Sequence, residues 1–278
     1  MGLFQPPRRY GRIYRRQRPV KSNRGRSGSL EGTAVRKFAA VIFDVDDTLF
    51  DREAAQLLVL DIIIERYPEL FGKHDKQKIA EAFLESDRLV TRDFQDGKPS
   101  SGLRRSRSIH FLQLLGLSDE YADKLTDFYV HNLPGVRATM EGADELISRL
   151  SGQYRIGIIS NGLPDVQYRK LESIGIRQHC HCVVLSEELG IRKPDAGIFL
   201  HTASLLGVPP AACLYVGNSY RDDVIGAANA GMSACWFNRK AVSPPENTDF
   251  VPSLVITRLR ELPALLAGHV NRQAGAHT

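Results

Sequence analysis

The first continuous apolar stretch that reads as a strand, Phe38 to Phe43, contains no polar position, so it predicts a strand buried on both faces. Similar short runs follow at 154–159, 182–185, 213–216, 233–237 and 254–256. Between them, apolar residues recur with helical spacing at about 142–151, 164–174, 195–206, 222–230 and 257–267. Because strands and helices alternate, we expect an α/β fold in which helices cover both faces of a parallel sheet.

One segment between the first and second predicted strands breaks this alternation. Residues 51–133 contain no apolar run of the strand type, and their apolar positions indicate helices at 53–66, 76–92, 104–115 and 119–131. Gly and Pro mark turns within 97–102, and Gly116 marks another. We therefore expect 51–133 to form a helical domain inserted into a sheet domain made of 37–50 and 134–270.

The N-terminal segment has a different character. Residues 1–36 lack a sustained apolar period and are rich in Arg, Gly, Ser and Pro, which predicts a disordered tail. The first 37 residues carry a charge of +10, so the rest of the chain carries −5 although the total is +5. Three interpretations of the tail stay open: a passive extension, an organelle-targeting segment, or an arm that binds nucleic acid or another anionic surface. Residues 271–278 are expected to be a flexible C-terminus.

The composition narrows the class of protein. Of the 278 residues, 42% are hydrophobic, which is enough for a sizeable core and excludes wholesale disorder. The best apolar run, 57–64, is far shorter than the roughly 18 residues of a membrane span, so none is expected. Four Cys in a chain of this length do not make a secreted disulfide scaffold. We therefore expect an intracellular, cytoplasmic protein with reduced thiols.

Acidic residues gather where the first predicted strand ends. The strand runs into Asp44-Val45-Asp46-Asp47-Thr48, and the alternation of side chains starts Asp44 and Asp46 on the same side. Ligands of parallel α/β sheets bind at the carboxyl ends of the strands. Acids crowded there repel one another unless a cation or a proton intervenes. For Asp47 alone, a helix cap or a solvated turn is the preferred interpretation.

Three later segments, each at or soon after a strand end, carry further polar residues. The first offers a hydroxyl and backbone N–H groups before a helix, the second a lysine at a helix start, and the third two acids in a first helical turn. They are Ser160-Asn161-Gly162, Lys193-Pro194-Asp195 and the segment from Gly217 to Asp223. Each alone is equally typical of an ordinary turn or helix start. Together with Asp44 and Asp46 they predict one small cleft.

In the order and spacing of these four motifs, the chain resembles the haloacid dehalogenase-like (HAD) hydrolase superfamily over about residues 38–260, in particular its helical-capped (subfamily I) phosphatases. The resemblance implies a Rossmann-like, doubly wound core with an inserted helical cap. It also implies Mg²⁺-dependent hydrolysis of a small phosphomonoester, such as a sugar phosphate or a nucleoside monophosphate, through an aspartyl-phosphate. Haloacid dehalogenase or phosphomutase chemistry on the same fold is one alternative. Non-enzymatic binding of an anionic surface through the basic tail is another.

The resemblance also implies residue roles. Asp44 would attack phosphorus, and Asp46 would protonate the leaving oxygen and then activate water. Lys193 would neutralise negative charge, while Ser160 and the N–H of Asn161 would bind a phosphoryl oxygen. Two further residues, one after the first strand and one in the inserted helices, are candidate substrate contacts: Thr48 and Arg107. Dehalogenases need no acid at the place of Asp46, so this residue favours phosphoryl transfer.

The metal site departs from the commoner pattern of the superfamily. Mg²⁺ would be held by Asp44, the backbone carbonyl of Asp46 and acids of the last motif. Many relatives have Asp where this chain has Asn218, which can offer a carbonyl oxygen but no charge. Side chains of Asp222 and Asp223 should point apart on a helix, and we favour Asp223 as the ligand. A small phosphorylated metabolite is the expected partner, nucleic acid is not favoured, and the oligomeric state is not predicted.

Overall fold

The computed structural model describes residues 35–95, 102–246, 248, 250–268 and 270–271. The predicted tail up to residue 34, the turn at 96–101 and the segment 272–278 lie outside these residues. Val35–Arg36 (β1) pairs antiparallel with Val270–Asn271 (β8), so the last two residues of the predicted tail and the first of the predicted flexible C-terminus belong to the fold. Such a two-residue pair is too short to leave a periodic signal in the sequence.

Six parallel strands form the central sheet, in the spatial order β4-β3-β2-β5-β6-β7. They are β2 (Ala40–Phe43), β3 (Arg155–Ser160), β4 (Cys182–Leu185), β5 (Cys213–Gly217), β6 (Ser233–Phe237) and β7 (Leu254–Ile256). The predicted α/β fold with a parallel sheet is confirmed. The chain begins at the centre, builds one side through β3 and β4, and then crosses β2 to build the other side. The loops that follow β2, β3 and β5 therefore surround the point where the strand order reverses, which is where such sheets bind ligands.

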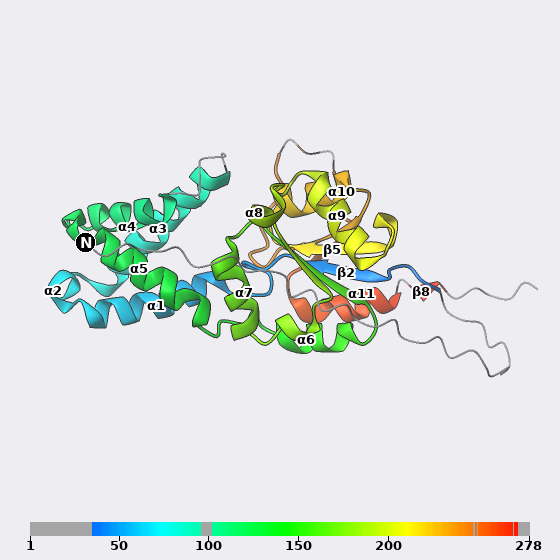
Figure 1. Cartoon of the computed structure of the whole chain (residues 1–278), viewed down its shortest axis with the longest axis horizontal. Helices are drawn as coiled ribbons and strands as arrows, with labels where there is room; N and C mark the ends of the chain where they lie inside the picture. The colour runs from blue at the N-terminus through cyan, green and yellow to red at the C-terminus, as the bar shows by residue number, and fades with distance from the viewer. Residues whose placement is uncertain (1–34, 96–101, 247, 249, 269, 272–278) are drawn as a thin grey trace, which may run out of the picture.

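Helices cover both faces of this sheet (Figure 1). One face carries α6 (Ala143–Ser151), α7 (Pro164–Ser173) and α11 (Leu262–Gly268), and the other carries α8 (Ser186–Leu189), α9 (Ala196–Leu206) and α10 (Gly226–Asn229). Alternate residues of β2 enter the two cores: Val41 and Phe43 pack with α6 and α11, whereas Ala40 and Ile42 pack with α9 and α10. All four side chains are fully buried, which explains why the strand has no polar position.

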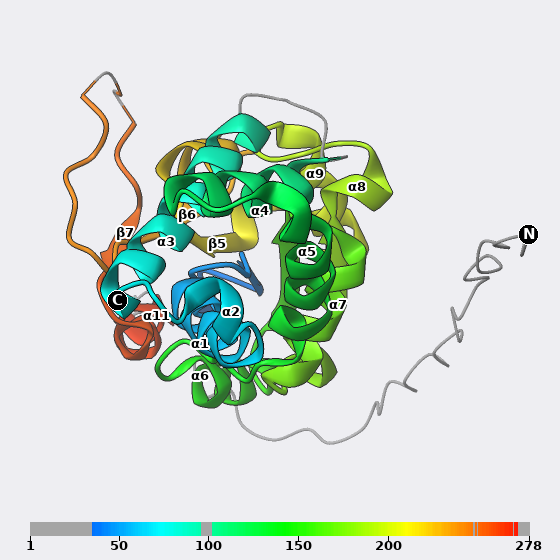
Figure 2. The ribbon, with the colours of Figure 1, turned by 90° about the vertical axis from the view of Figure 1, so that its left-hand side faces the viewer.

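Before α6, the described residues between β2 and β3 form five α-helices, one more than the four that the sequence predicts. They are α1 (Arg52–Arg66), α2 (Pro68–Phe71), α3 (Lys76–Gln95), α4 (Leu103–Leu114) and α5 (Ala122–Asn132). Phe111 of α4 packs against two other helices of this group. Its ring stacks on Phe71 of α2 with ring centres 5.6 Å apart, and it contacts Phe83 of α3 edge-on at 5.1 Å. We call α1–α5 the inserted helices. They form a body beside the sheet in Figure 1, and Figure 2 shows them from their outer side, in front of the strands.

The remaining differences from the sequence prediction are local. The short helices α2 and α8 were not predicted, because one turn is too short to show a period. The predicted helix 222–230 is instead a π-helical turn, Tyr220–Ile225, followed by α10. Among the described helices, none combines the length and the apolar character that crossing a membrane requires.

Candidate active site

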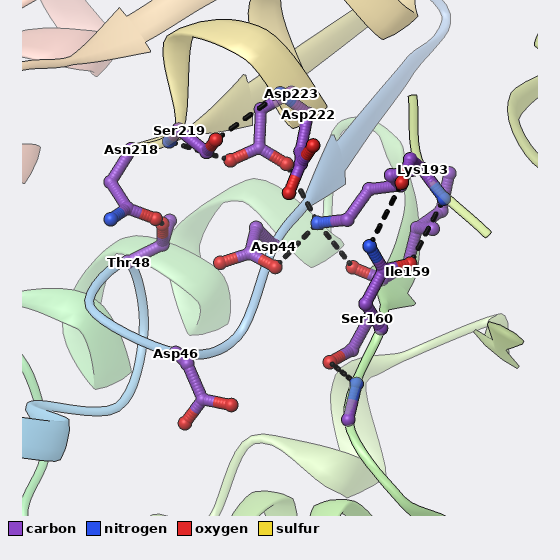
Figure 3. A network of polar contacts seen from close by, with 12 residues as sticks. Asp44, Asp46, Thr48, Ile159, Ser160, Lys193, Asn218, Ser219, Asp222 and Asp223 are labelled. Carbon is purple, nitrogen blue, oxygen red and sulfur yellow. Dashed lines mark hydrogen bonds and ion pairs between the residues drawn. The ribbon is translucent and has the colours of Figure 1, made fainter. Parts of the chain in front are cut away.

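The four predicted motifs meet at one edge of the sheet (Figure 3). Lys193 Nζ lies 2.6 Å from Asp44 Oδ1 and 2.6 Å from Asp223 Oδ1. Asp44 and Lys193 are 149 positions apart in the sequence. Both are buried, at 7% and 4% exposure, so this charge cluster is largely shielded from solvent. The structure therefore brings the first, third and fourth motifs into direct contact.

Lys193 is held by its backbone as well as by its amine. The Asn161 side chain donates to the Lys193 carbonyl at 3.0 Å and accepts from the Lys193 N–H at 2.9 Å. The amine also lies 3.0 Å from the Tyr215 hydroxyl and 3.4 Å from the Ile159 carbonyl. Asn161 thus links the loop after β3 to the loop before α9. The sequence pointed only to its backbone N–H, because a contact between two loops leaves no local pattern.

Asp223 fits against the backbone at the end of β5. Its Oδ2 accepts the Ser219 N–H at 2.8 Å, and its Oδ1 accepts the Tyr215 hydroxyl at 3.0 Å. A Cβ placed on Gly217 would lie 2.4 Å from this carboxyl group, so only glycine allows the close approach. Gly217 is therefore a structural requirement of the site.

The expectation that Asp222 and Asp223 point apart is wrong. Both line the same cavity, and Figure 3 shows both carboxylates on the side of Lys193. The chain turns there as a π-helix, Tyr220–Ile225, rather than as the expected α-helix. Asp222 is half-buried, and its carboxylate forms no hydrogen bond with the other described residues. Burial, followed by the charge of Asp223, raises the pKa of Asp222.

Asp46 has two partners that the sequence did not reveal. Lys170 Nζ lies 2.5 Å from Asp46 Oδ1, and Gln167 Nε2 donates to Asp46 Oδ2 at 2.7 Å. Burial by itself would raise the pKa of Asp46, but the charges of Lys170 and Arg52 and these hydrogen bonds lower it. The two partners are three residues apart on α7 and therefore share a face, a signal that is common on any helix.

Thr48 and Asn218 form a pair beside the charge cluster. The Thr48 hydroxyl is fully buried and donates to Asn218 Oδ1 at 3.3 Å. The indole of Trp236 donates to the Asn218 backbone carbonyl at 3.0 Å. Asn218 lines the cavity, whereas Thr48 is not among the residues of its wall. The geometry thus makes Thr48 a residue that orients Asn218, and it gives no support to the predicted contact with substrate.

The electrostatics of the cluster leave negative charge uncompensated. Burial raises the pKa of Asp44 to about 7, with the charge of Asp223 adding to the effect and Lys193 opposing it. Burial would lower the pKa of Lys193, but the Asp223 and Asp44 carboxylates outweigh burial and hold it well above its usual value. One ammonium is therefore shared by two buried carboxylates. A further cation near these carboxylates would be bound favourably.

A cavity of about 420 Å³ connects this cluster with the inserted helices. Its wall includes Asp44, Asp46, Ser160, Asn161 and Lys193 from the sheet domain. The opposite wall consists largely of side chains from α1, α3, α4 and α5, among them Arg52, Asp87, Phe94, Arg104, Arg107 and Tyr129. Ser160 Oγ accepts the Gly162 N–H at 3.0 Å and faces the same space. The predicted site residues, except Thr48, thus line one cavity.

An ion pair between α1 and α3 lies in the opposite wall. The Arg52 guanidinium contacts both carboxylate oxygens of Asp87, at 2.8 and 2.7 Å, and Arg107 Nη1 lies 3.9 Å from Asp87. Burial would raise the pKa of Asp87, but the charges of Arg52 and Arg107 and the hydrogen bonds lower it below its ordinary 3.8. The carboxylate therefore stabilises the folded chain wherever it is ionised.

Replacing Asp87 with asparagine should lower the free energy of unfolding at neutral pH by about 3 kcal/mol, because two arginines lose their counter-charge. Since the folded-state pKa of Asp87 is depressed, this contribution is complete above the unfolded value near 3.8 and is lost as the pH falls through the folded value. Urea unfolding of wild type and variant should therefore show a difference that narrows in acid. The matched control is Glu85→Gln, which breaks an exposed pair with Arg88 and should cost less than about 1 kcal/mol. Equal costs for the two variants would contradict the assignment.

Comparisons with known proteins identify a family and several relatives that this chain resembles. A sequence model of the haloacid dehalogenase-like hydrolase family matches residues 38–231. The pyrimidine 5′-nucleotidase YjjG of Escherichia coli strain K12 is 29% identical over 238 residues, which are 84% of this chain and 100% of that protein. The solved structure of the HAD-hydrolase YfnB of Bacillus subtilis, bound to magnesium, has a TM-score of 0.70 and 26% identity, and the match covers 83% of this chain and 99% of that one.

A further solved structure is that of a 2-haloacid dehalogenase from Pseudomonas syringae pv. Tomato DC3000. It has a TM-score of 0.55 and 28% identity, and the match covers 83% of this chain and 99% of that one. Similar proteins thus include one named as a nucleotidase and one named as a dehalogenase. The choice between their reactions depends on the residues of the site.

Proposed function

The chain belongs to the haloacid dehalogenase-like hydrolase family, and from this premise we propose that it is a Mg²⁺-dependent phosphatase of a small phosphomonoester. The observation that carries the proposal is the pair of differently charged environments around Asp44 and Asp46. Asp44 lies against Lys193 and Asp223, whereas Asp46 lies against Lys170 and Gln167. Two carboxylates with separate surroundings can take separate roles, one as nucleophile and one as proton carrier.

In the proposed reaction, Asp44 attacks phosphorus, a new O–P bond forms, and the bond to the leaving oxygen breaks. Lys193 holds the carboxylate in place and offsets the charge of the phosphoryl group. Ser160 Oγ and nearby backbone N–H groups face the cavity, where they can bind a phosphoryl oxygen. Water then attacks the aspartyl-phosphate, which returns Asp44 and releases inorganic phosphate.

Asp46 moves the proton in both steps of this scheme. It donates to the leaving oxygen and later takes a proton from the attacking water. Because Lys170 and Arg52 lower its pKa, Asp46 is ionised at rest in neutral solution. An anionic substrate nearby would raise that pKa and favour the protonated acid. Lys170 and Gln167 also fix the direction of the carboxylate by binding both of its oxygens.

The residues of the site fit Mg²⁺. The available donors are all oxygens: Asp44, the backbone carbonyl of Asp46, the Asn218 side chain and the carboxylates of Asp222 and Asp223. Described His, Cys, Asp and Glu residues form no ready cluster of three metal ligands. A donor set made of oxygens alone suits an ion that keeps several of its waters, as Mg²⁺ does. When bound, the ion would offset the repulsion between the carboxylate of Asp44 and an anionic phosphate. Asp223 is the preferred acid, with Asp222 as the second.

Carbon–halogen cleavage is less well supported than phosphate release. Halide leaves without a proton, so a dehalogenase has no use for an acid at the place of Asp46. In this chain Asp46 lines the cavity and binds two buried side chains, Lys170 and Gln167. Another alternative, a phosphomutase, would share the first step and pass the phosphoryl group to a second hydroxyl instead of water.

Purified protein should hydrolyse p-nitrophenyl phosphate in the presence of Mg²⁺ and release inorganic phosphate. Chelation with EDTA should lower the rate by at least about a hundredfold, and added Mg²⁺ should restore it, because metal stabilisation of such a reaction amounts to several kcal/mol. The matched assay is chloride release from 2-chloropropionate, where no activity is expected. Chloride release in the absence of phosphate release would replace the proposal with dehalogenase chemistry. A rate of phosphate release that is unchanged by EDTA would refute the role of the metal.

A further inference from the structure

The inserted helices contribute a polar cluster to the wall of the cavity. We call it the arginine subsite, defined by Arg52, Gln56, Asp87, Arg107 and Tyr129. These residues come from α1, α3, α4 and α5, and all but Gln56 line the cavity that also holds Asp44. A substrate whose phosphate lies at Asp44 would therefore have its leaving group in the same cavity as this subsite.

Most polar atoms of the arginine subsite already have partners. Arg52 binds both oxygens of Asp87 and also lies 3.2 Å from the Thr91 hydroxyl. Gln56 donates to the Tyr129 hydroxyl at 3.1 Å. Both oxygens of the Asp87 carboxylate thus bind Arg52, and neither lies within hydrogen-bond distance of Arg107.

Arg107 is the exception. Its guanidinium lies over the Tyr129 ring at 3.4 Å, and its Nη1 reaches Asp87 only at 3.9 Å. Its Nη2 is buried and has no hydrogen-bond partner among the described residues. The residue is only 8% exposed, and burial lowers its pKa below the usual value. A buried donor without a partner is costly, so the site is more stable when a ligand supplies an acceptor.

The other two arginines of the cavity wall are already engaged. Arg104 forms two hydrogen bonds with Asp165, both at 2.9 Å. Arg192 donates to the Phe94 carbonyl at 3.0 Å, and its guanidinium lies 4.3 Å from the centre of the Phe94 ring. Among the described residues of the wall formed by the inserted helices, Arg52 is thus paired with Asp87 and Arg104 with Asp165, whereas Arg107 has no carboxylate within hydrogen-bond distance. The unpaired charge of Arg107 favours an anion over a neutral acceptor.

We propose that Arg107 Nη2 binds a carboxylate on the leaving group, so that the preferred substrate is a small phosphorylated carboxylic acid. The proposal rests on the phosphatase function proposed above and specifies its substrate class. A guanidinium suits a carboxylate in geometry as well as in charge, and the ion pair would form in a buried place where it is poorly screened. The volume of about 420 Å³ suits a small acid.

The test compares phosphate esters that differ mainly in a carboxylate. The pairs are O-phosphoserine with O-phosphoethanolamine, and 3-phosphoglycerate with glycerol 3-phosphate. Wild type should show kcat/KM at least about tenfold higher for the acid of each pair, as expected for a hydrogen bond between charged groups. Arg107→Met should bring the ratio close to one, and Arg107→Lys, which keeps the charge, should give an intermediate ratio. The matched control is Arg105→Met, on the same helix, because Arg105 is exposed and binds Asp123.

The outcomes separate this inference from the proposed function. If wild type hydrolyses p-nitrophenyl phosphate but treats the members of each pair alike, the carboxylate assignment is overturned and the phosphatase stands. If p-nitrophenyl phosphate is not hydrolysed, the phosphatase proposal itself fails. A selectivity that survives in Arg107→Met, or a wild-type preference for uridine 5′-monophosphate over every acid, also overturns the assignment. Should Arg107→Met fail to fold, the test rests on Arg107→Lys. An unchanged ratio of kcat/KM between the members of each pair in that variant contradicts the assignment.

Discussion

Asp44→Asn should lower kcat/KM for p-nitrophenyl phosphate by about 10⁴-fold or more, the scale on which loss of a nucleophile acts. The amide has nearly the same shape and can still accept a hydrogen bond from Lys193, which now lies 2.6 Å from Asp44 Oδ1. It cannot form the aspartyl-phosphate, because it lacks the carboxylate nucleophile. The measurement is phosphate release at saturating Mg²⁺. Equal residual rates in wild type and variant would show that turnover does not pass through this residue.

The same variant has a distinct signature in stability. Burial raises the pKa of Asp44 to about 7 from an ordinary 3.8, so metal-free wild type loses stability as the pH rises between these values. The amide of the Asp44→Asn variant carries no such charge. In EDTA the variant should therefore unfold at the same temperature as wild type in acid and at a higher temperature above about pH 7. A variant that is less stable than wild type throughout would indicate that its lost activity reflects misfolding.

Lys193→Met should have the second largest effect. Removing the ammonium leaves Asp44 and Asp223 buried without the cation that both contact at 2.6 Å. We expect kcat/KM to fall by about 10³-fold, as for loss of a preorganised charge, and the free energy of unfolding to fall by about 3 to 5 kcal/mol at neutral pH. The stability deficit should shrink in acid, where Asp44, whose pKa is raised by burial, takes up a proton.

The control for this substitution is Lys240→Met. Lys240 is 67% exposed in its side chain and pairs with Glu53 at 3.0 Å, so the change should cost less than about 1 kcal/mol. Urea unfolding and phosphate release, measured together, separate the electrostatic role of Lys193 from general damage. A stable Lys193→Met variant with wild-type turnover would remove Lys193 from the mechanism.

The helices and strands that could be predicted are those whose apolar residues repeat over at least one buried face. β2, with four fully buried residues, and α3, with its long helical period, are examples. The elements that could not be predicted, α2, α8 and the β1–β8 pair, span too few residues to show a period. The π-helical turn at Tyr220–Ile225 was mistaken for α-helix for a related reason, since a single turn does not distinguish the two periods.

The residues of the candidate site also fall into those that the sequence predicts and those that it does not. Asp44, Asp46, Ser160, Lys193 and Asp223 could be named because each lies at a strand end or in a loop soon after one. The residue types at these positions form recognisable sequence motifs. The partners that complete the site have no such mark: Gln167 and Lys170 look like ordinary residues of α7, and Asn161 shows its contact with Lys193 only once two loops meet.

The order of apolar and polar residues by itself determined the parallel α/β sheet, the inserted helices and the carboxylates at the strand ends, because burial and backbone periodicity act over a few neighbouring residues. Tertiary structure alone decided that Thr48 orients Asn218, that Asp222 and Asp223 share a cavity, and that Arg107 keeps a buried nitrogen without a partner among the described residues. These facts depend on distances between side chains of different elements. Such distances are set by how the helices pack on the sheet and on one another, which no local stretch of sequence encodes.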